Sequence, residues 1–445
     1  MGNTSLNEMP WEFEARIRPA LQVSIGYIFL QTFNYLGLND PFKQLTFLRI
    51  ITALLSWIVI SRLFILLIKD YKNEKTKQLL LFVSFFVWFI PFLNVRFSSE
   101  NYASISMLAG VFFILKSPKQ KSNQVYYNLI AGLLLGLSFF FSFQMAFSIV
   151  GIGLWLILDK KETWKNLTFI IAGGAIAFLL CISLDYWLYG SLELTPYNYY
   201  TANISLNLAA EWGTMPWWFY LNAYILSGIP PFSIILLILF VWGVYTKPSS
   251  IFVWVIIPFL IAHFLVGHKE LRFLFPMIFC FTCVAVNGFD AFIGNKIIAK
   301  PLRILTILIL VINTPILVVK AITPAQEAVS YFRYLNELGN HQKVVIICPE
   351  KSVYAISGLE ANFYKNEHVS VFAATNENSV KECLNELNAP KMLVLNRNLM
   401  MDESFPGYKK RHLYCAYPKW IKQINFFNWI SRSRIWEIEE VESIK

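Results

Sequence analysis

The chain has 445 residues, of which 56% are hydrophobic and only 15% charged, and its mean hydropathy is +0.51. These values exclude an ordinary soluble protein, in which about a quarter of the residues are charged. They predict an α-helical polytopic membrane protein. The net charge of +10 does not indicate nucleic-acid binding, because much of the Lys and Arg surplus lies in short loops between apolar runs, where basic residues mark the cytoplasmic side.

The apolar runs approach or exceed the roughly 20 residues that a helix needs to cross a bilayer. In chain order, runs of this kind lie at 45–68, 78–95, 126–141, 167–184, 232–245 and 302–319. Basic loops lie at 69–77, 116–121, 159–165, around Lys247, and at 295–303. We assign all five to the cytoplasm. The segments 96–100, 185–218 and 267–272, and everything after about Ala321, then face the other side.

We divide the chain into an outer-face or interfacial segment (1–40), a multi-span transmembrane domain (41–322) and a small exoplasmic α/β domain (323–445). The C-terminal assignment depends on apolar runs of strand length at 343–348, 369–374 and 391–396. Between the last two, residues 378–387 have the apolar spacing of a helix.

Four ionisable residues, His268, Lys269, Glu270 and Arg272, lie together between two apolar runs. Charges are costly inside a bilayer, so this group belongs at an interface, in a watery cavity or in a site. The simpler alternative is a set of topological anchors at an ordinary helix end.

Other segments on the same side carry polar groups suited to sugar chemistry. Arg96 and Glu100 are four residues apart and would share one face of a helix, and the segment 185–218 combines carboxylates with Tyr, Trp and Asn. Aromatic loops are also typical of membrane interfaces. Cations could neutralise a lipid phosphate as the leaving group while a carboxylate accepts the proton of an attacking hydroxyl. A transporter would instead place its charges near the midplane, at broken helices.

Four elements in order along the chain resemble glycosyltransferase family 22, the polytopic mannosyltransferases that use dolichyl-phosphate mannose in GPI-anchor and N-glycan precursor synthesis. MPWEFEARIRPAL is similar to the family's "TWEFE..IRSWL", and VRFSSENY to its Arg, Ser/Thr-rich, Glu element. A third match joins DYWLYGSLELTPYNYYTANI and WGTMPWWFYL, which resemble the family's "D..FYG….P.NF…N" and "YGTHPWHWY" elements. GHKELRFLFP resembles the "HKEERF" signature, with Leu271 where a second Glu is usual.

The resemblance implies a GT-C-like transferase. A hexose, mannose above all, would pass with inversion from a polyprenyl or dolichyl phosphate to a glycan or glycolipid acceptor, without an Asp-x-Asp site, a cofactor or a divalent metal. The donor phosphate would lie near His268, Lys269, Arg272 and Arg96. The residues that would orient substrate or loops are Glu270, Glu100, Trp217 and Tyr220.

In the family, a first transmembrane helix and an outer Asp/Glu pair precede the Trp-Glu segment, and that pair is expected to supply the catalytic base. The chain begins MGNTSLNEMPWEFE, with neither. We therefore expect a truncated start, with the base upstream of Met1, Glu12 and Glu14 beside its position, and Asp185 orienting a loop or substrate. The alternative is that 20–38 crosses the membrane.

The expected location is a bacterial inner membrane with the site facing the periplasm, the alternative being the endoplasmic reticulum with a lumenal site. Two other functions stay open: a transporter or flippase of lipid-linked sugars, and an inactive relative if the start is authentic.

Overall fold

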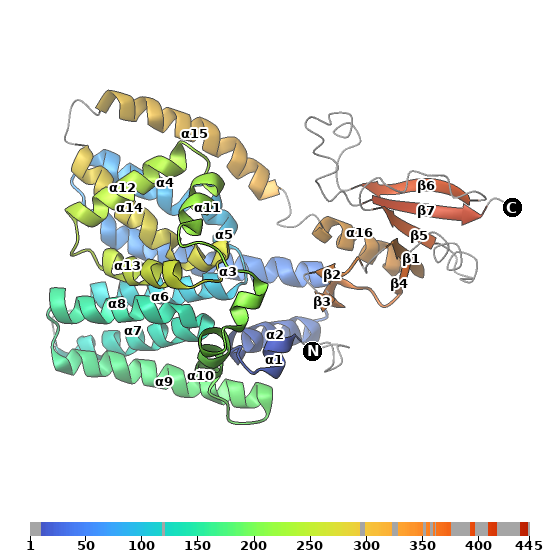
Figure 1. Cartoon of the computed structure of the whole chain (residues 1–445), viewed down its shortest axis with the longest axis horizontal. Coiled ribbons are helices and arrows are strands. Elements are labelled where there is room, and N and C mark those ends of the chain that lie inside the picture. Colours follow the sequence, from blue (N-terminus) through green and yellow to red (C-terminus); the bar gives the residue numbers. More distant parts are fainter. Residues whose placement is uncertain are drawn as a thin grey trace. The chain divides into compact units, whose positions relative to one another are not determined.

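Ten stretches of the chain are described by the computed structural model: residues 10–117, 121–293, 299–322, 328–349, 353–356, 359–360, 362–374, 392–396, 408–415 and 437–443. They form two units (Figure 1). One is helical and consists of Trp11–Asn39 and Gln44–Ala321. The other consists mainly of the chain from Ile322 onward.

The helical unit is built from helices that run back and forth between two ends (Figure 1). The helices are α1 (Trp11–Glu14), α2 (Ala20–Tyr35), α3 (Pro41–Leu67), α4 (Glu74–Phe85), α5 (Phe89–Asn94), α6 (Ser99–Lys116), α7 (Lys121–Phe141), α8 (Ala146–Leu154), α9 (Trp164–Tyr189), α10 (Thr195–Tyr200), α11 (Phe219–Ser227), α12 (Phe232–Thr246), α13 (Ile251–Leu265), α14 (Ile278–Phe292) and α15 (Ala299–Ile322).

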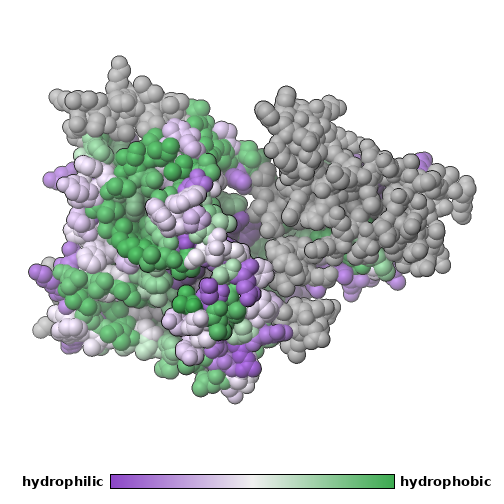
Figure 2. All heavy atoms as spheres, viewed as in Figure 1, coloured by the Kyte–Doolittle hydropathy of each residue, from purple (hydrophilic) through white to green (hydrophobic). Residues whose placement is uncertain are grey.

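The helical unit has the apolar exterior of a membrane protein. Within the described residues, four helices are long and apolar enough to cross a bilayer, namely Pro41–Asp70, Asn123–Phe141, Trp164–Tyr189 and Leu271–Phe292. A further apolar pair, α12 and α13, is bent by 117°. Only 22% of the most apolar window of α3, and the same share of α9, is buried. Figure 2 shows broad apolar areas on the visible face of this unit. The chain is a multi-pass membrane protein.

Close helix contacts explain several glycines. A methyl group on Gly132 of α7 would lie 1.8 Å from the carbonyl oxygen of Ile170 in α9. One on Gly173 of α9 would lie 2.1 Å from the carbonyl oxygen of Leu129. Small residues let membrane helices approach until their backbones touch. This contact holds α9 against α7 and thereby positions the end of α9, where the polar segments gather.

One predicted span is wrong as a continuous helix. The run 78–95 forms α4 and α5 with a break between them. The amide of Asn313 in α15 bonds both edges of the break: its Nδ2 donates to the Phe86 carbonyl at 2.8 Å, and its Oδ1 accepts from the Trp88 N–H at 2.8 Å. These bonds replace those that an unbroken helix would make with itself, which apolar surroundings otherwise require.

Described residues in or beside the loops that we assign to the cytoplasm lie at one end of the helical unit. The Lys160 ammonium donates to the Ile114 carbonyl at 3.2 Å, and the Trp155 indole donates to the Ser249 carbonyl at 2.9 Å. At the same end, the hydroxyl of Tyr71, which precedes α4, donates to the Asn287 side chain in α14 at 2.7 Å. The segment 20–38, which could have crossed the membrane, forms α2, a helix of only 16 residues.

The second unit is an α/β structure. Strands β4 (Val369–Ala374), β1 (Val344–Pro349), β5 (Met392–Asn396), β7 (Glu437–Ser443) and β6 (Tyr408–Cys415) form a sheet in that order. The first three are parallel, and β7 is antiparallel to both β5 and β6. A small hairpin pairs β2 (Ala355–Ile356) with β3 (Leu359–Glu360).

The core of this unit lies between α16 (Ala328–His341) and β1, where Tyr331, Phe332 and Leu335 pack with Val344 and Ile346. The three strands expected from the sequence are confirmed as β1, β4 and β5. The helix expected at 378–387 lies outside the described residues.

Candidate active site

Asp185, near the end of α9, joins two of the outer segments, 1–40 and 185–218. Its side chain is fully buried. One carboxylate oxygen accepts a hydrogen bond from the Ala20 backbone N–H at 2.7 Å, and the other accepts one from the Thr195 hydroxyl at 2.6 Å. The starts of α2 and α10 are therefore tied to α9. With both oxygens engaged in this way, Asp185 is suited to holding loops rather than to taking a proton.

A second tie lies nearby. Arg16 forms an ion pair with Glu193, and the Arg16 side chain also donates to the Ser191 hydroxyl at 2.9 Å. Hydrogen bonds from Ser191 and Arg16 lower the pKa of Glu193. The Tyr189 hydroxyl donates to the Arg18 carbonyl at 2.7 Å. The segment that follows α1 is thus held by the end of α9 and the loop after it.

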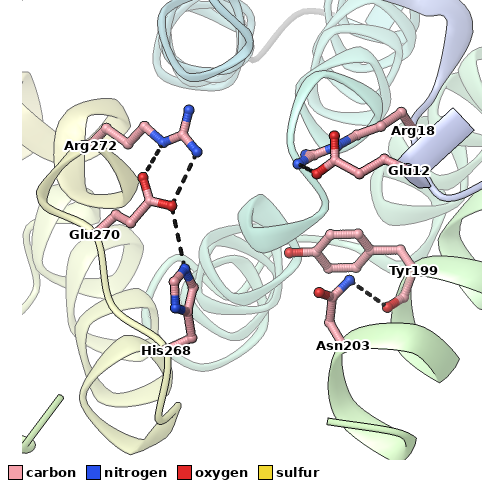
Figure 3. Close-up of polar contacts among 7 residues, drawn as sticks. All are labelled: Glu12, Arg18, Tyr199, Asn203, His268, Glu270 and Arg272. Carbon is pink, nitrogen blue, oxygen red and sulfur yellow. Dashed lines mark hydrogen bonds and ion pairs between the residues drawn. The ribbon is translucent and has the colours of Figure 1, made fainter. Parts of the chain in front are cut away.

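These ties position a first polar group, which consists of Glu12, Arg18, Tyr199 and Asn203 (Figure 3). Arg18 and Glu12 form an ion pair. Burial works against the charge of Arg18, but the hydrogen bond and charge of Glu12 outweigh it and raise the pKa of the guanidinium. Burial raises the pKa of the Tyr199 hydroxyl, against the opposing charge of Arg18. The Asn203 amide donates to the Tyr199 carbonyl at 3.1 Å.

A second polar group consists of His268, Glu270 and Arg272. The carboxylate of Glu270 lies 2.6 Å from Arg272 Nε and 3.3 Å from His268 Nε2. The other ring nitrogen of His268 lies 3.0 Å from the Gly213 carbonyl. The ring is therefore held between the Glu270 carboxylate and the Gly213 carbonyl. Arg272 remains half-exposed, so its guanidinium can still meet a ligand.

The two groups lie opposite each other, and the Tyr199 hydroxyl points from the first group toward the second (Figure 3). The second group is anchored to the long outer segment by the Met215 N–H, which donates to the Gly267 carbonyl at 2.9 Å. The site thus presents cations and a carboxylate on each of two opposed sides. Such an arrangement can neutralise a phosphate on one side while a polar ligand binds at the other.

Four other residues expected from the sequence belong to neither polar group. Lys269 is only 5% exposed, and its ammonium donates to the Val266 carbonyl. Burial lowers the pKa of Lys269. Tyr220 is buried and its ring centroid lies 6.0 Å from the Lys269 ammonium. Trp217 and Glu14 are exposed.

Arg96 and Glu100 do not share a helix face, because α6 begins only at Ser99; that expectation is wrong. Their charges nevertheless act on each other. Arg96 stacks over the Phe92 ring at 4.1 Å and lines a narrow recess of about 30 Å³, to which Phe275 also contributes. A cation at an apolar recess is a suitable neighbour for a lipid phosphate.

Sequence reasoning missed Arg18, Tyr199 and Asn203. Arg18 lies in the quoted Trp-Glu element and Tyr199 in the aromatic outer segment, so composition pointed to their segments. Their individual positions depend on contacts between distant parts of the chain.

Metal-ligand types come together at one place in the described residues. His412, Glu437 and Glu439, on β6 and β7, can bring one ligand atom each within 4.8 Å of one another. All three make other interactions. This group belongs to the second unit, and the residues of the candidate site contain no comparable cluster among those described.

A comparison with known protein families gives one match. Residues 4–357 match the model of the Alg9-like mannosyltransferase family. The chain belongs to this family. No solved structure matches the chain significantly.

Relatives within this family include GPI mannosyltransferase 3 of Candida albicans, 26% identical over 273 residues, which cover 60% of the chain and 52% of the relative. GPI alpha-1,2-mannosyltransferase 3 of Bos taurus is 23% identical over 288 residues, 61% of the chain and 50% of the relative. Mannosyltransferase APTG1 of Arabidopsis thaliana is 24% identical over 284 residues, which cover 61% of the chain and 48% of the relative. The chain spans about half the length of these relatives.

Proposed function

We propose that the chain is an integral-membrane mannosyltransferase that moves mannose from a polyprenyl or dolichyl phosphate to a glycan or glycolipid acceptor, with inversion at the anomeric carbon. Family membership supports the mannosyl group and the reaction class. The observation that carries the proposal is the pair of opposed polar groups. The transfer needs a cation at the leaving phosphate and a carboxylate across from it to take a proton, and Arg272 and Glu12 lie on opposite sides of the site.

In this mechanism Arg272 and His268 hold the donor phosphate. Positive charge placed where the leaving phosphate gains negative charge lowers the barrier, since it acts more strongly on the transition state than on the bound donor. Glu270 keeps both cations in place through the two contacts described above. Arg96, beside its narrow apolar recess, supplies a further cation for the same lipid-linked phosphate.

On the opposite side Glu12 accepts the proton. The acceptor hydroxyl oxygen bonds to the anomeric carbon, the bond from that carbon to the phosphate oxygen breaks, and the proton of the hydroxyl passes to a carboxylate. Among the described carboxylates of the site, Glu12 faces the cationic group without being paired to it, and Arg18 fixes its orientation. We place this site on the side opposite the basic loops: the periplasm of a bacterium or the lumen of the endoplasmic reticulum.

A transporter of lipid-linked sugars would carry its charges in the middle of its spans. The charged side chains of the two groups lie instead before α2, or at and just before the first turn of the span Leu271–Phe292, which supports the transferase.

The test uses membranes that contain the full chain, supplied with polyprenyl-phosphate [³H]mannose and a glycolipid acceptor. We expect Arg272→Ala to lower the rate by about 100-fold, as removal of a preorganised charge contact typically does. Lys165→Ala, an exposed cation at the start of α9, serves as the control and should transfer at the wild-type rate. Wild-type rates in Arg272→Ala and His268→Ala would show that the phosphate lies elsewhere.

A further inference from the structure

A mixed set of metal-ligand side chains, the β6–β7 group, lies on one face of the sheet in the second unit. It consists of His412 and Cys415 on β6 and of Glu437 and Glu439 on β7. One ligand atom from each of His412, Glu437 and Glu439 lies within 4.8 Å of the other two. The Cys415 thiol donates to Oε1 of Glu437 at 3.3 Å. An imidazole, a thiol and two carboxylates are therefore brought to one place.

A β-bulge brings the four residues to the same face. The two strands are antiparallel, and His412 lies opposite Glu439. Cys415 lies opposite Glu437. Residues directly opposite each other share a face, and so do residues two apart on one strand. In a regular strand His412 and Cys415, three residues apart, would point to opposite faces. The register shift between His412 and Tyr414 adds one residue to β6 and turns Cys415 to the face of His412.

The other face of these strands packs on the core of the unit. Ile438, between the two glutamates, is buried in that core, and Tyr414 stacks on Tyr334 of α16 with 5.0 Å between ring centroids. The β6–β7 group is therefore turned away from α16. Even so, Glu437 is only 3% exposed, and His412 and Glu439 are half-buried. Carboxylates are rarely buried to this extent unless a cation or hydrogen bonds compensate their charge, which sets this group apart from an exposed acidic cluster.

The ligand set fits zinc. Zn²⁺ binds imidazole nitrogen, thiolate sulfur and carboxylate oxygen at about 2.0–2.3 Å, with four ligands in a tetrahedron. Two ligand atoms on one such ion lie about 3.3–3.8 Å apart, so atoms already within 4.8 Å of one another need only small side-chain rotations. Calcium and magnesium prefer oxygen ligands alone, and a site with an imidazole and a thiol disfavours them.

We propose that all four members of the β6–β7 group bind one Zn²⁺ ion, which fastens β6, the edge strand of the described sheet, to β7. On binding, the Cys415 thiol releases its proton to water and its sulfur bonds to the metal as a thiolate. The other interactions of His412, Glu437 and Glu439 are exchanged for bonds to the ion. With four protein ligands, zinc has no open position for a substrate, so the site is structural. This inference does not depend on the proposed function.

Metal analysis of the purified full chain, without a histidine tag, tests the proposal. The protein in detergent is treated with EDTA, freed of it by gel filtration, incubated with ZnCl₂ and analysed by elemental mass spectrometry. We expect one zinc ion per chain and a zinc-dependent rise in melting temperature, because a ligand that binds the folded chain alone stabilises it.

His412→Asn and Glu439→Gln are the test variants, since both side chains are half-buried and their loss leaves the apolar core unchanged. Each should weaken zinc binding by more than the roughly 10- to 100-fold that loss of a hydrogen-bond partner of a metal ligand costs. Each should also lose the rise in melting temperature. His341→Asn and Glu337→Gln make the same changes at exposed residues of α16 and should bind zinc as the wild type does.

Cobalt reports on the fourth ligand. Co²⁺ bound in place of zinc should show a charge-transfer band from the thiolate to the metal, and Cys415→Ser should abolish that band. A band that persists in Cys415→Ser, a wild type that retains no zinc, or zinc binding unchanged in His412→Asn and Glu439→Gln would each overturn the proposal. An equal rise in melting temperature with Ca²⁺ or Mg²⁺ would also overturn it. None of these measurements uses turnover, so they give the same answer whether or not the chain transfers mannose.

Discussion

The backbone N–H of Ala20 donates a 2.7 Å hydrogen bond to the carboxylate of Asp185, across 165 residues of sequence. This contact joins the segment that carries Glu12 and Arg18 to a membrane helix. The side of the site that carries Glu12 and Arg18 is therefore positioned by α9 and not by the residues next to it in the sequence.

Asp185→Asn is therefore expected to destabilise the protein. The amide oxygen can still accept from the Ala20 N–H, and the NH₂ group can donate to the Thr195 hydroxyl oxygen. The hydroxyl must then turn its proton away from position 185, so this buried proton loses its acceptor and both bonds lose their charge, at a cost of about 1–3 kcal/mol. The melting temperature in detergent should fall, and protease should cut the segment before α2 more readily. Thr195→Val leaves one oxygen of the buried Asp185 carboxylate without its donor and should destabilise the protein as well. Equal stability of Asp185→Asn and wild type would contradict this role.

Glu270→Gln is expected to affect activity more than stability. The carboxylate is partly exposed, and exposed ion pairs contribute at most about 1 kcal/mol to folding. The loss of orientation at Arg272 and His268 should lower kcat/KM for the donor by about 10- to 100-fold. Glu74→Gln removes the Lys77 ion pair at the other end of the unit and should change neither quantity measurably. A large fall in melting temperature for Glu270→Gln would mean that the group is structural.

Burial of Lys269 predicts how stability depends on pH. Burial lowers the pKa of Lys269 below the ordinary 10.5, so between these values the unfolded chain binds the proton and the folded chain does not. The contribution of Lys269 to the free energy of unfolding therefore rises with pH between its pKa in the folded chain and its pKa in the unfolded chain. The melting temperature of the wild type, relative to Lys269→Met, should increase as the pH rises from neutral toward 10. A difference that stays constant with pH would show that the ammonium is not destabilised.

The contact between α7 and α9 gives a packing prediction. Gly132→Ala places a methyl group against the Ile170 carbonyl and should cost about 2 kcal/mol or more, because backbone cannot move aside as a side chain can. Gly153→Ala in α8, where a methyl group meets nothing within 4 Å, is the matched control and should fold normally. The yield of monodisperse protein in detergent and its melting temperature give the readout. Tolerance of Gly132→Ala would indicate that these helices are farther apart.

Much of the architecture could be predicted from the sequence because it depends on local patterns. Apolar runs and basic loops identified the membrane domain, and runs of strand length identified β1, β4 and β5. The break between α4 and α5 could not be predicted, because the amide that bonds its edges belongs to Asn313, more than 200 residues further along. Hydropathy alone shows a continuous run there.

The candidate site shows the same limit. Charge and family resemblance pointed to His268, Glu270 and Arg272, which contact one another within five residues of sequence. Glu12 was recognised as acidic, but its partner Arg18 and its neighbour Tyr199 could not be assigned without the fold. Tyr199 reaches this place only because Thr195, at the start of α10, bonds to the buried Asp185.

The ties at Asp185 and Glu193 make the side with Glu12 and Arg18 a cross-linked piece that moves with α9, while the bonds of Glu270 make the side with His268 and Arg272 a second piece between α13 and α14. Each side keeps its own ion pairs if the distance between them changes. A bulky lipid-linked sugar could therefore be admitted by a small displacement of one helix layer against another, with no rearrangement of the charged side chains. The selectivity of the site for substrate size would then depend on how far the helices that carry its two sides can separate.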